Sequence, residues 1–278
     1  MSMAEKILNL DRRVLFIVVF ITGVFFAINP IGFPVTTQSW VSDFYQEIDD
    51  LEPGDLVLVH WSIGATSTEQ IAGSTPVMQQ LFRKEGIKMV HFSLGIQVEI
   101  SDQLIDNADP AGNGKIYGED YVQLGYIAGG ETAVAAIGSD LKGTFGTDWY
   151  GTSLSDVPLW NEISGDMAEF KLIVSSSSFD PGADVVRRQL QVPYGTPMIM
   201  VGGAGGLTSS MQWYNTKQYE GMLLGMTDNS AYEILIGIPG IAARSTDVLS
   251  MLYVVAIIFI VIGNVAYVMS PRQGGRAD

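Results

Sequence analysis

Two long apolar segments, one near each end of the chain, constrain this sequence more than any other feature. The second, LSMLYVVAIIFIVIGNVAYVM over residues 249–269, contains no charged side chain. The first, VLFIVVFITGVFFAI over residues 14–28, continues into the residues NPIGFPV. A helix needs about 20 residues to cross the hydrocarbon core of a bilayer. The pattern therefore predicts transmembrane helices over residues 14–35 and 247–270.

The first apolar segment has a second interpretation, a cleaved signal peptide. A basic stretch with Lys6, Arg12 and Arg13 precedes it, and its uninterrupted apolar run is short. Signal peptides share both features, but the residues around Ala27 form a poor A-x-A cleavage site. We therefore interpret the segment as an uncleaved anchor.

Basic residues lie on the outer side of both apolar segments. Arg12 and Arg13 precede the first, whereas Arg272 and Arg276 follow the second. Because basic flanks stay in the cytoplasm, we expect both termini there and the central domain outside the cell membrane. The predicted parts are a cytoplasmic tail (1–13), a transmembrane helix (14–35), an extracytoplasmic domain (36–246), a transmembrane helix (247–270) and a cytoplasmic tail (271–278).

The central region is acidic and has no cysteine. Residues 14–270 hold 27 acidic and 10 basic side chains, which gives them a net charge of −17. Such a charge repels nucleic acid phosphates and argues against a DNA- or RNA-binding function. Since the chain has no cysteine, thiolate catalysis, iron–sulfur clusters and cysteine-ligated zinc are excluded.

Short apolar runs alternate with amphipathic stretches through the central region. The runs predict buried strands over residues 56–61, 87–93, 170–174 and 198–201. The stretches predict helices over residues 40–51, 66–86, 130–141, 184–194 and 209–235. Gly- and Asp-rich loops are expected over residues 102–118 and 144–156. The alternation is typical of an α/β fold with a mostly parallel sheet and helices on both faces, as in Rossmann-like domains.

Polar residues lie at the ends of the predicted strands, where ligands bind in open parallel sheets. The only two histidines, His60 and His91, occupy equivalent places on successive strands. If those strands are neighbours, the rings could form a metal pair or a base with its orienting partner. Two satisfied core residues are the alternative. The remaining candidates for a catalytic site are Ser93, Ser178 and Asp180.

A glycine run follows the strand predicted over residues 198–201. Gly202, Gly203, Gly205 and Gly206 precede the residues LTSS, a plausible helix start, so backbone N–H groups there could bind an anionic ligand. The run matches neither the G-x-G-x-x-G motif nor the P-loop motif. A tight turn is the alternative interpretation.

Residues 109–120 partly match a calcium-binding loop. Asp109, Asn113 and Asp120 take its first, fifth and twelfth positions, and Gly114 takes its sixth. The third-position carboxylate and the final Glu are missing. Calcium is therefore the candidate cofactor, with a surface turn as the alternative.

One segment of the central region is similar to a segment of other proteins. The sequence YGEDYVQLGYIAGGE over residues 117–131 resembles a segment of uncharacterised prokaryotic membrane proteins. Those proteins also end in an apolar helix containing Gly-Asn, as Gly263 and Asn264 do here. The resemblance implies the same architecture of two terminal transmembrane helices, and it implies no activity.

The favoured function is a non-enzymatic binding or scaffold subunit of a membrane assembly. The chain has two anchors and lacks the G-x-S-x-G and H-E-x-x-H motifs of hydrolases and zinc proteases. Gly23 and Asn264 in the spans could pack against other membrane subunits or a second copy in a homo-oligomer. The alternative is an envelope hydrolase at the carboxyl edge of the sheet, with one histidine as base. A sensor is the third possibility, although the short tails leave little room for an output module.

Overall fold

The computed structural model describes residues 3–29, 31–178 and 182–270, and the chain divides into two compact units. One unit is the domain Val35–Ala242. The other joins Met1–Pro34 to Ala243–Asp278 and contains the apolar segments. Each unit is described by itself.

The domain is built on a sheet of six strands, all of them parallel. The order across the sheet is β3-β2-β1-β4-β5-β6, so the winding reverses between β1 and β4, as in doubly wound folds. This confirms the predicted α/β class with a parallel sheet. The strands are β1 (Leu56–Ser62), β2 (Lys88–Ser93), β3 (Tyr121–Tyr126), β4 (Phe170–Ser177), β5 (Met198–Gly202) and β6 (Gly221–Leu224).

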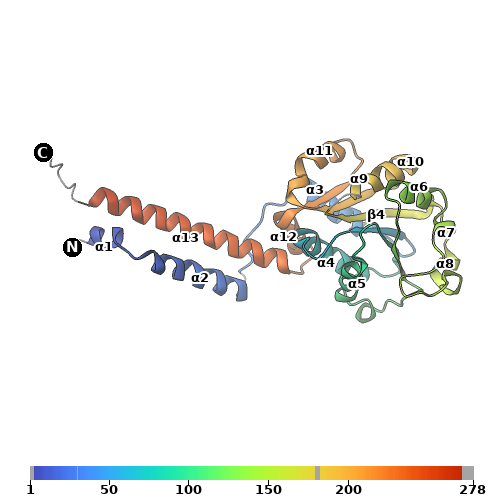
Figure 1. Ribbon diagram of the computed structural model, residues 1–278, viewed down its shortest axis with the longest axis horizontal. Helices are drawn as coiled ribbons and strands as arrows, with labels where there is room; N and C mark the ends of the chain where they lie inside the picture. The colour runs from blue at the N-terminus through green and yellow to red at the C-terminus, as the bar shows by residue number, and fades with distance from the viewer. Residues whose placement is uncertain (1–2, 30, 179–181, 271–278) are drawn as a thin grey trace. The chain divides into compact units, whose positions relative to one another are not determined.

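Helices cover both faces of the sheet (Figure 1). The first face is covered by α3 (Ser39–Asp49), α4 (Thr68–Arg83), α5 (Val98–Asn107) and α12 (Gly225–Leu235). The second is covered by α6 (Glu131–Ser139), α7 (Leu141–Thr144), α8 (Pro158–Glu162), α9 (Ala183–Val186) and, at its border, α11 (Leu207–Asn215). Shorter elements are η1 (Ala111–Asn113), η2 (Leu154–Asp156), η3 (Met167–Glu169), η4 (Arg187–Gln191), α10 (Val192–Tyr194) and η5 (Ala204–Gly206).

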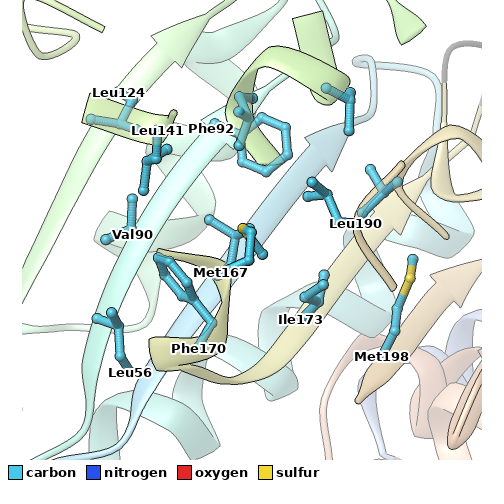
Figure 2. Close-up of a cluster of buried hydrophobic side chains, with 14 of the residues drawn as sticks. Leu56, Val90, Phe92, Leu124, Leu141, Met167, Phe170, Ile173, Leu190 and Met198 are labelled. Carbon is cyan, nitrogen blue, oxygen red and sulfur yellow. The ribbon is translucent and has the colours of Figure 1, made fainter. Parts of the chain in front are cut away.

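Alternating side chains along each strand divide the core into two apolar layers. Leu58 and Phe92 belong to the layer under α6 and α9, whereas Val59 belongs to the layer under α4. Figure 2 shows the first layer, where Phe92 of β2 and Ile173 of β4 point into one cluster. Because the strands are buried on both faces, they appear in the sequence as continuous apolar runs.

Helix α3 covers the β6 edge of the sheet, at the position where the sequence predicted a helix over residues 40–51. Its buried face is formed by Val41, Phe44 and Ile48. Gly221 of β6 allows the close approach, because a Cβ atom there would collide with the backbone of Phe44.

The prediction of one long helix over residues 209–235 was wrong. The region contains three elements: α11, the strand β6 and α12. Gly225, whose φ of +81° is accessible to glycine, separates the strand from the last helix. The apolar run of β6 is too short for its periodicity to distinguish a strand from a helix turn. Strand β3 was also missed, and α5 occupies part of the predicted loop over residues 102–118.

In the second unit, α13 (Ile241–Met269) is the one helix of the described residues that is long and apolar enough to span a membrane. It contains most of the predicted span over residues 247–270. Helix α2 (Arg12–Ile28) is also apolar but has 17 residues, and it follows the short helix α1 (Met3–Leu8). It ends well before residue 35, where the sequence placed the end of the first span.

Asp247 of α13 holds the segment that follows α2 within the same unit. Its Oδ2 atom accepts hydrogen bonds from the backbone N–H groups of Ile31 and Gly32, both at 2.7 Å. Its Oδ1 atom accepts one from Phe33 at 2.9 Å. Since the Asp247 side chain is buried, these charge-assisted bonds join the two apolar helices at one end.

Candidate functional site

A pocket of about 280 Å³ lies at the carboxyl edge of the sheet, beside β4 and β5. Strand β5 contributes Met200 and strand β4 contributes Ser177, its last residue. Helices α9 and α11 supply most of the remaining wall. Its lining residues are Ser177, Gly182, Ala183, Asp184, Met200, Ser209, Ser210, Trp213 and Tyr219.

Asp184, the charged residue of the pocket lining, is paired with two arginines that do not themselves line the pocket. Asp184 Oδ1 accepts hydrogen bonds from Arg187 Nε at 3.1 Å and Arg187 Nη2 at 2.6 Å. Asp184 Oδ2 accepts one from Arg188, which also pairs with Glu131 at 3.1 Å. Arg187 additionally donates to Gln218. The wall therefore carries charge that is already compensated.

Arg187 also organises the aromatic side of the pocket. Its guanidinium carbon lies 3.7 Å from the centre of the Trp213 ring, a stacked cation–π contact. Only 5% of Arg187 is exposed. Burial raises the pKa of the neighbouring Tyr219 hydroxyl, and the charge of Arg187 opposes that shift. Tyr219 is therefore a neutral hydroxyl at all physiological pH values.

Arg187 begins a π-helical turn, η4, that continues from α9. Single π-helical turns are rare and occur often at functional sites, because the extra residue redirects the side chains around it. Here the turn follows Asp184 in the chain and begins at the arginine that contacts it. The π-helical turn therefore lies next to the pocket, beside its lining residue Asp184.

Three serine hydroxyls line the pocket from two directions. Ser177 lies at the end of β4, while Ser209 and Ser210 lie in the first turn of α11. The hydroxyl of Ser209 donates to Gly206 O at 3.0 Å, which leaves its oxygen able to accept. Ser210 is 7% exposed, so a ligand that reached its hydroxyl would be largely removed from water.

The structure separates the two histidines. Strands β1 and β2 are neighbours, but His60 is in register with Phe92, and His91 with Val59. Because successive side chains of a strand point to opposite faces, His60 and His91 face different core layers. They form neither a metal pair nor a base with its orienting partner.

Each histidine is a buried, neutral core residue. His60 Nδ1 is 2.8 Å from Ser175 Oγ, and His91 Nδ1 accepts a hydrogen bond from Trp61 Nε1 at 3.3 Å. The Nε2 atoms of both rings have no hydrogen-bond partner among the described residues. Burial lowers the pKa of each ring to about 3.

The other catalytic candidates are bound to nearby backbone and hydroxyl groups. Ser93 Oγ donates to Gly95 O at 2.7 Å, and Ser178 Oγ lies 2.6 Å from Ser67 Oγ. These bonds fasten the loops that follow β2 and β4. Asp180 lies outside the described residues.

The glycine run forms the turn η5 between β5 and α11. Glu69 of α4 reaches this turn, because its Oε2 atom accepts a hydrogen bond from the backbone N–H of Ala204 at 2.9 Å. A Cβ atom on Gly203 would lie 3.0 Å from the same carboxylate oxygen. An anionic ligand at this turn would meet the charge of Glu69. Gly202, Gly205 and Gly206 complete the turn, so its contacts fit the alternative of a tight turn.

Each of the three calcium candidates forms hydrogen bonds within its own turn. Asp109 accepts from the backbone N–H of Gly112 at 3.0 Å, and Asp120 from that of Ile116 at 2.8 Å. The amide of Asn113 donates to backbone oxygens, so its nitrogen faces the turn. Within the described residues, no group of three His, Asp or Glu side chains is placed to hold a metal ion.

The residues that line the pocket were mostly missed by the sequence analysis. Ser209 and Ser210 were identified only as a helix start after the glycine run. Asp184 and Arg187 are three residues apart, a spacing typical of an ordinary helical ion pair. The contact of Arg187 with Trp213 joins distant segments, and no local pattern in the sequence signals it.

No protein-family model, curated protein or solved structure matches this chain.

Proposed function

We propose that this chain is a membrane-anchored, non-enzymatic binding protein whose α/β domain binds a small molecule in the pocket beside β4 and β5. The observation that carries the proposal is the pocket itself. It lies at the carboxyl edge of a doubly wound sheet, the usual ligand site of such folds. It combines an apolar wall with a few hydroxyls, a composition typical of ligand sites.

The same region offers little support for hydrolysis. A general base must reach the proton that it removes and must be able to titrate. His60 and His91 are fully buried in separate core layers and remain neutral. In the pocket wall, Asp184 forms ion pairs with both Arg187 and Arg188. These contacts support binding rather than catalysis.

Two anchors would fit a binding or scaffold subunit of a membrane assembly. Helix α13 has no charged side chain from Val248 to Met269 and exposes apolar side chains such as Ile257 and Val261. We assign α2 as the second span, since its shorter apolar stretch is preceded by Arg12 and Arg13. Both termini would lie in the cytoplasm, with the domain outside the membrane. The exposed helix faces would pack against lipid, a second copy of the chain or other subunits.

Native mass spectrometry of the full-length protein, extracted from its own membrane in mild detergent, tests the proposal. The wild-type chain should retain a small molecule. Ser210→Phe should lose it, because the new ring fills the pocket. Thr208→Phe places the same ring on an exposed neighbour in α11 that does not line the pocket, so it should retain the molecule.

Two results would contradict the binding function. One is a wild-type protein without any retained molecule. The other is a molecule that Ser210→Phe and Thr208→Phe retain equally. The same spectra also report whether the chain forms a homo-oligomer or associates with other membrane subunits.

A further inference from the structure

We infer that the pocket takes a neutral, hydroxyl-bearing ring with one apolar face, such as a single monosaccharide unit. This inference rests on the proposed binding function and names its ligand class. It is carried by the charge balance of the wall, the placement of its hydroxyls, its aromatic side and its size.

The charge balance of the wall favours a neutral ligand. Arg187 is almost fully buried, pairs with Asp184, donates to Gln218 and contacts the Trp213 ring, so its charge is already balanced before a ligand binds. Asp184 carries two arginine contacts, so an added cation would meet Arg187 and Arg188. An ion entering the pocket would lose its hydration without gaining a free countercharge.

The polar groups of the pocket suit a ligand with several hydroxyls. A hydroxyl both donates and accepts, and a carboxylate has about four acceptor positions. Asp184 uses two on Oδ1 and one on Oδ2 for arginine, so a further position on Oδ2 could accept from a ligand hydroxyl. Ser209 and Ser210 present hydroxyls from neighbouring positions of α11. Together these groups could bind adjacent hydroxyls of one ring.

The remaining wall is apolar and partly aromatic. Met200, Trp213 and Tyr219 line it, and both Met200 and Tyr219 are buried. The guanidinium carbon of Arg187 lies over the Trp213 ring, 3.7 Å from its centre. A sugar ring has C–H groups on one face that can lie against such a surface, while its hydroxyls point to the rim.

The size of the pocket limits the ligand to one ring. Its volume of about 280 Å³ is just below the range of small-molecule sites, roughly 300–1,000 Å³. The strand order is one that dinucleotide-binding domains share, but Glu69 lies in the first turn of α4, the helix after β1. A pyrophosphate at that helix start would meet a negative charge. A dinucleotide is therefore a poor fit.

Calorimetric titration of the full-length protein in lipid nanodiscs tests the ligand class, since nanodiscs avoid the sugar head groups of common detergents. The probes are neutral hexoses (glucose, galactose and mannose), glucuronate and glucosamine. The last two place a carboxylate or an amine on the same kind of ring. A neutral hexose should bind more tightly than either charged form. Ser210→Ala should weaken it about two- to tenfold, the range for one hydrogen bond, and Thr208→Ala should leave it unchanged.

The outcomes separate the ligand class from the proposed function. Tighter Ser210-dependent binding of glucuronate or glucosamine would overturn the neutral class and leave the binding function standing. The neutral sugar class is also overturned if no sugar binds while the protein still retains a Ser210-dependent molecule in native mass spectra. If neither measurement detects a ligand that depends on Ser210, both proposals are overturned.

Discussion

At the residue scale, the two histidines make the stability of the domain depend on pH. Each ring has a pKa of about 3 in the folded domain because of its burial, against about 6.5 in an unfolded chain. Between these values the unfolded chain binds more protons than the folded one. The free energy of unfolding therefore falls as the pH drops below 6.5, and this contribution is fully present above that pH.

We expect His60→Gln and His91→Gln each to flatten this dependence. Between pH 3 and pH 6.5, each removed ring should reduce the slope of the unfolding free energy against pH by up to about 1.4 kcal/mol per pH unit. Denaturant unfolding, followed by tryptophan fluorescence between pH 4.5 and 7.5, measures the slope. A slope equal to that of the wild type in both variants would show that the rings already titrate in the folded domain.

Gly221 is the residue on which the contact between α3 and β6 depends. Gly221→Ala would place a methyl group against the backbone N and Cα atoms of Phe44, which cannot move without shifting the whole helix. We expect a loss of about 1–3 kcal/mol of stability, as for other overpacked sites. Gly205→Ala is the matched control, since a Cβ there meets nothing within 4 Å. Equal thermal midpoints for the two variants would contradict this packing.

At the element scale, the sequence was most informative where strands are long and buried. Strands β1, β2, β4 and β5 were all predicted from continuous apolar runs, and their alternation with helices indicated the parallel sheet. Strand β6 was missed because its four residues are flanked by polar side chains and glycine, and only pairing with β5 makes them a strand. Strand β3 was missed because Gln123 and Gly125 interrupt its apolar run.

The register between β1 and β2 places His60 and His91 on opposite faces of the sheet, so they cannot act as a pair. His60 and His91 are each two residues from the end of their strands, so in sequence they look equivalent. The strands pair with an offset of one residue, His60 to Phe92. A shift of one residue turns a side chain to the opposite face of the sheet. Register between distant strands is set by tertiary packing, which a sequence pattern does not contain.

Asp247 should control how α2 and α13 pair within the apolar unit. Its removal leaves three backbone N–H groups without their carboxylate. Ala27 and Val248 line one pocket in this unit, and the chain has no cysteine of its own. In Ala27→Cys/Val248→Cys, oxidation in membranes should form a cross-link, and adding Asp247→Ala should slow its formation at least severalfold.

Asp247→Asn is the matched comparison, since it keeps one oxygen able to accept a hydrogen bond. Its cross-linking rate should lie between those of the other two proteins. If Asp247→Ala cross-linked as quickly as the parent double-cysteine protein, the carboxylate would have no part in pairing the helices.

At the scale of the whole molecule, we propose that two spans carry the acidic binding domain outside the membrane. One of those spans, α13, satisfies the length and apolarity that a bilayer requires. The second span and the orientation are proposed from the apolar α2 and the basic residues around it. The placement matters for function, because it decides which small molecules reach the pocket.

Cysteine labelling in intact cells tests this claim most directly, because the chain contains no other thiol. Two single-cysteine variants are needed, Ala111→Cys in the exposed surface of the domain and Asn9→Cys before α2. A membrane-impermeant maleimide should label Ala111→Cys in intact cells, and Asn9→Cys only after the cells are made permeable. Protection of Ala111→Cys would place the domain in the cytoplasm, and labelling of both cysteines in intact cells would remove α2 as a span. Either result would overturn the proposed topology.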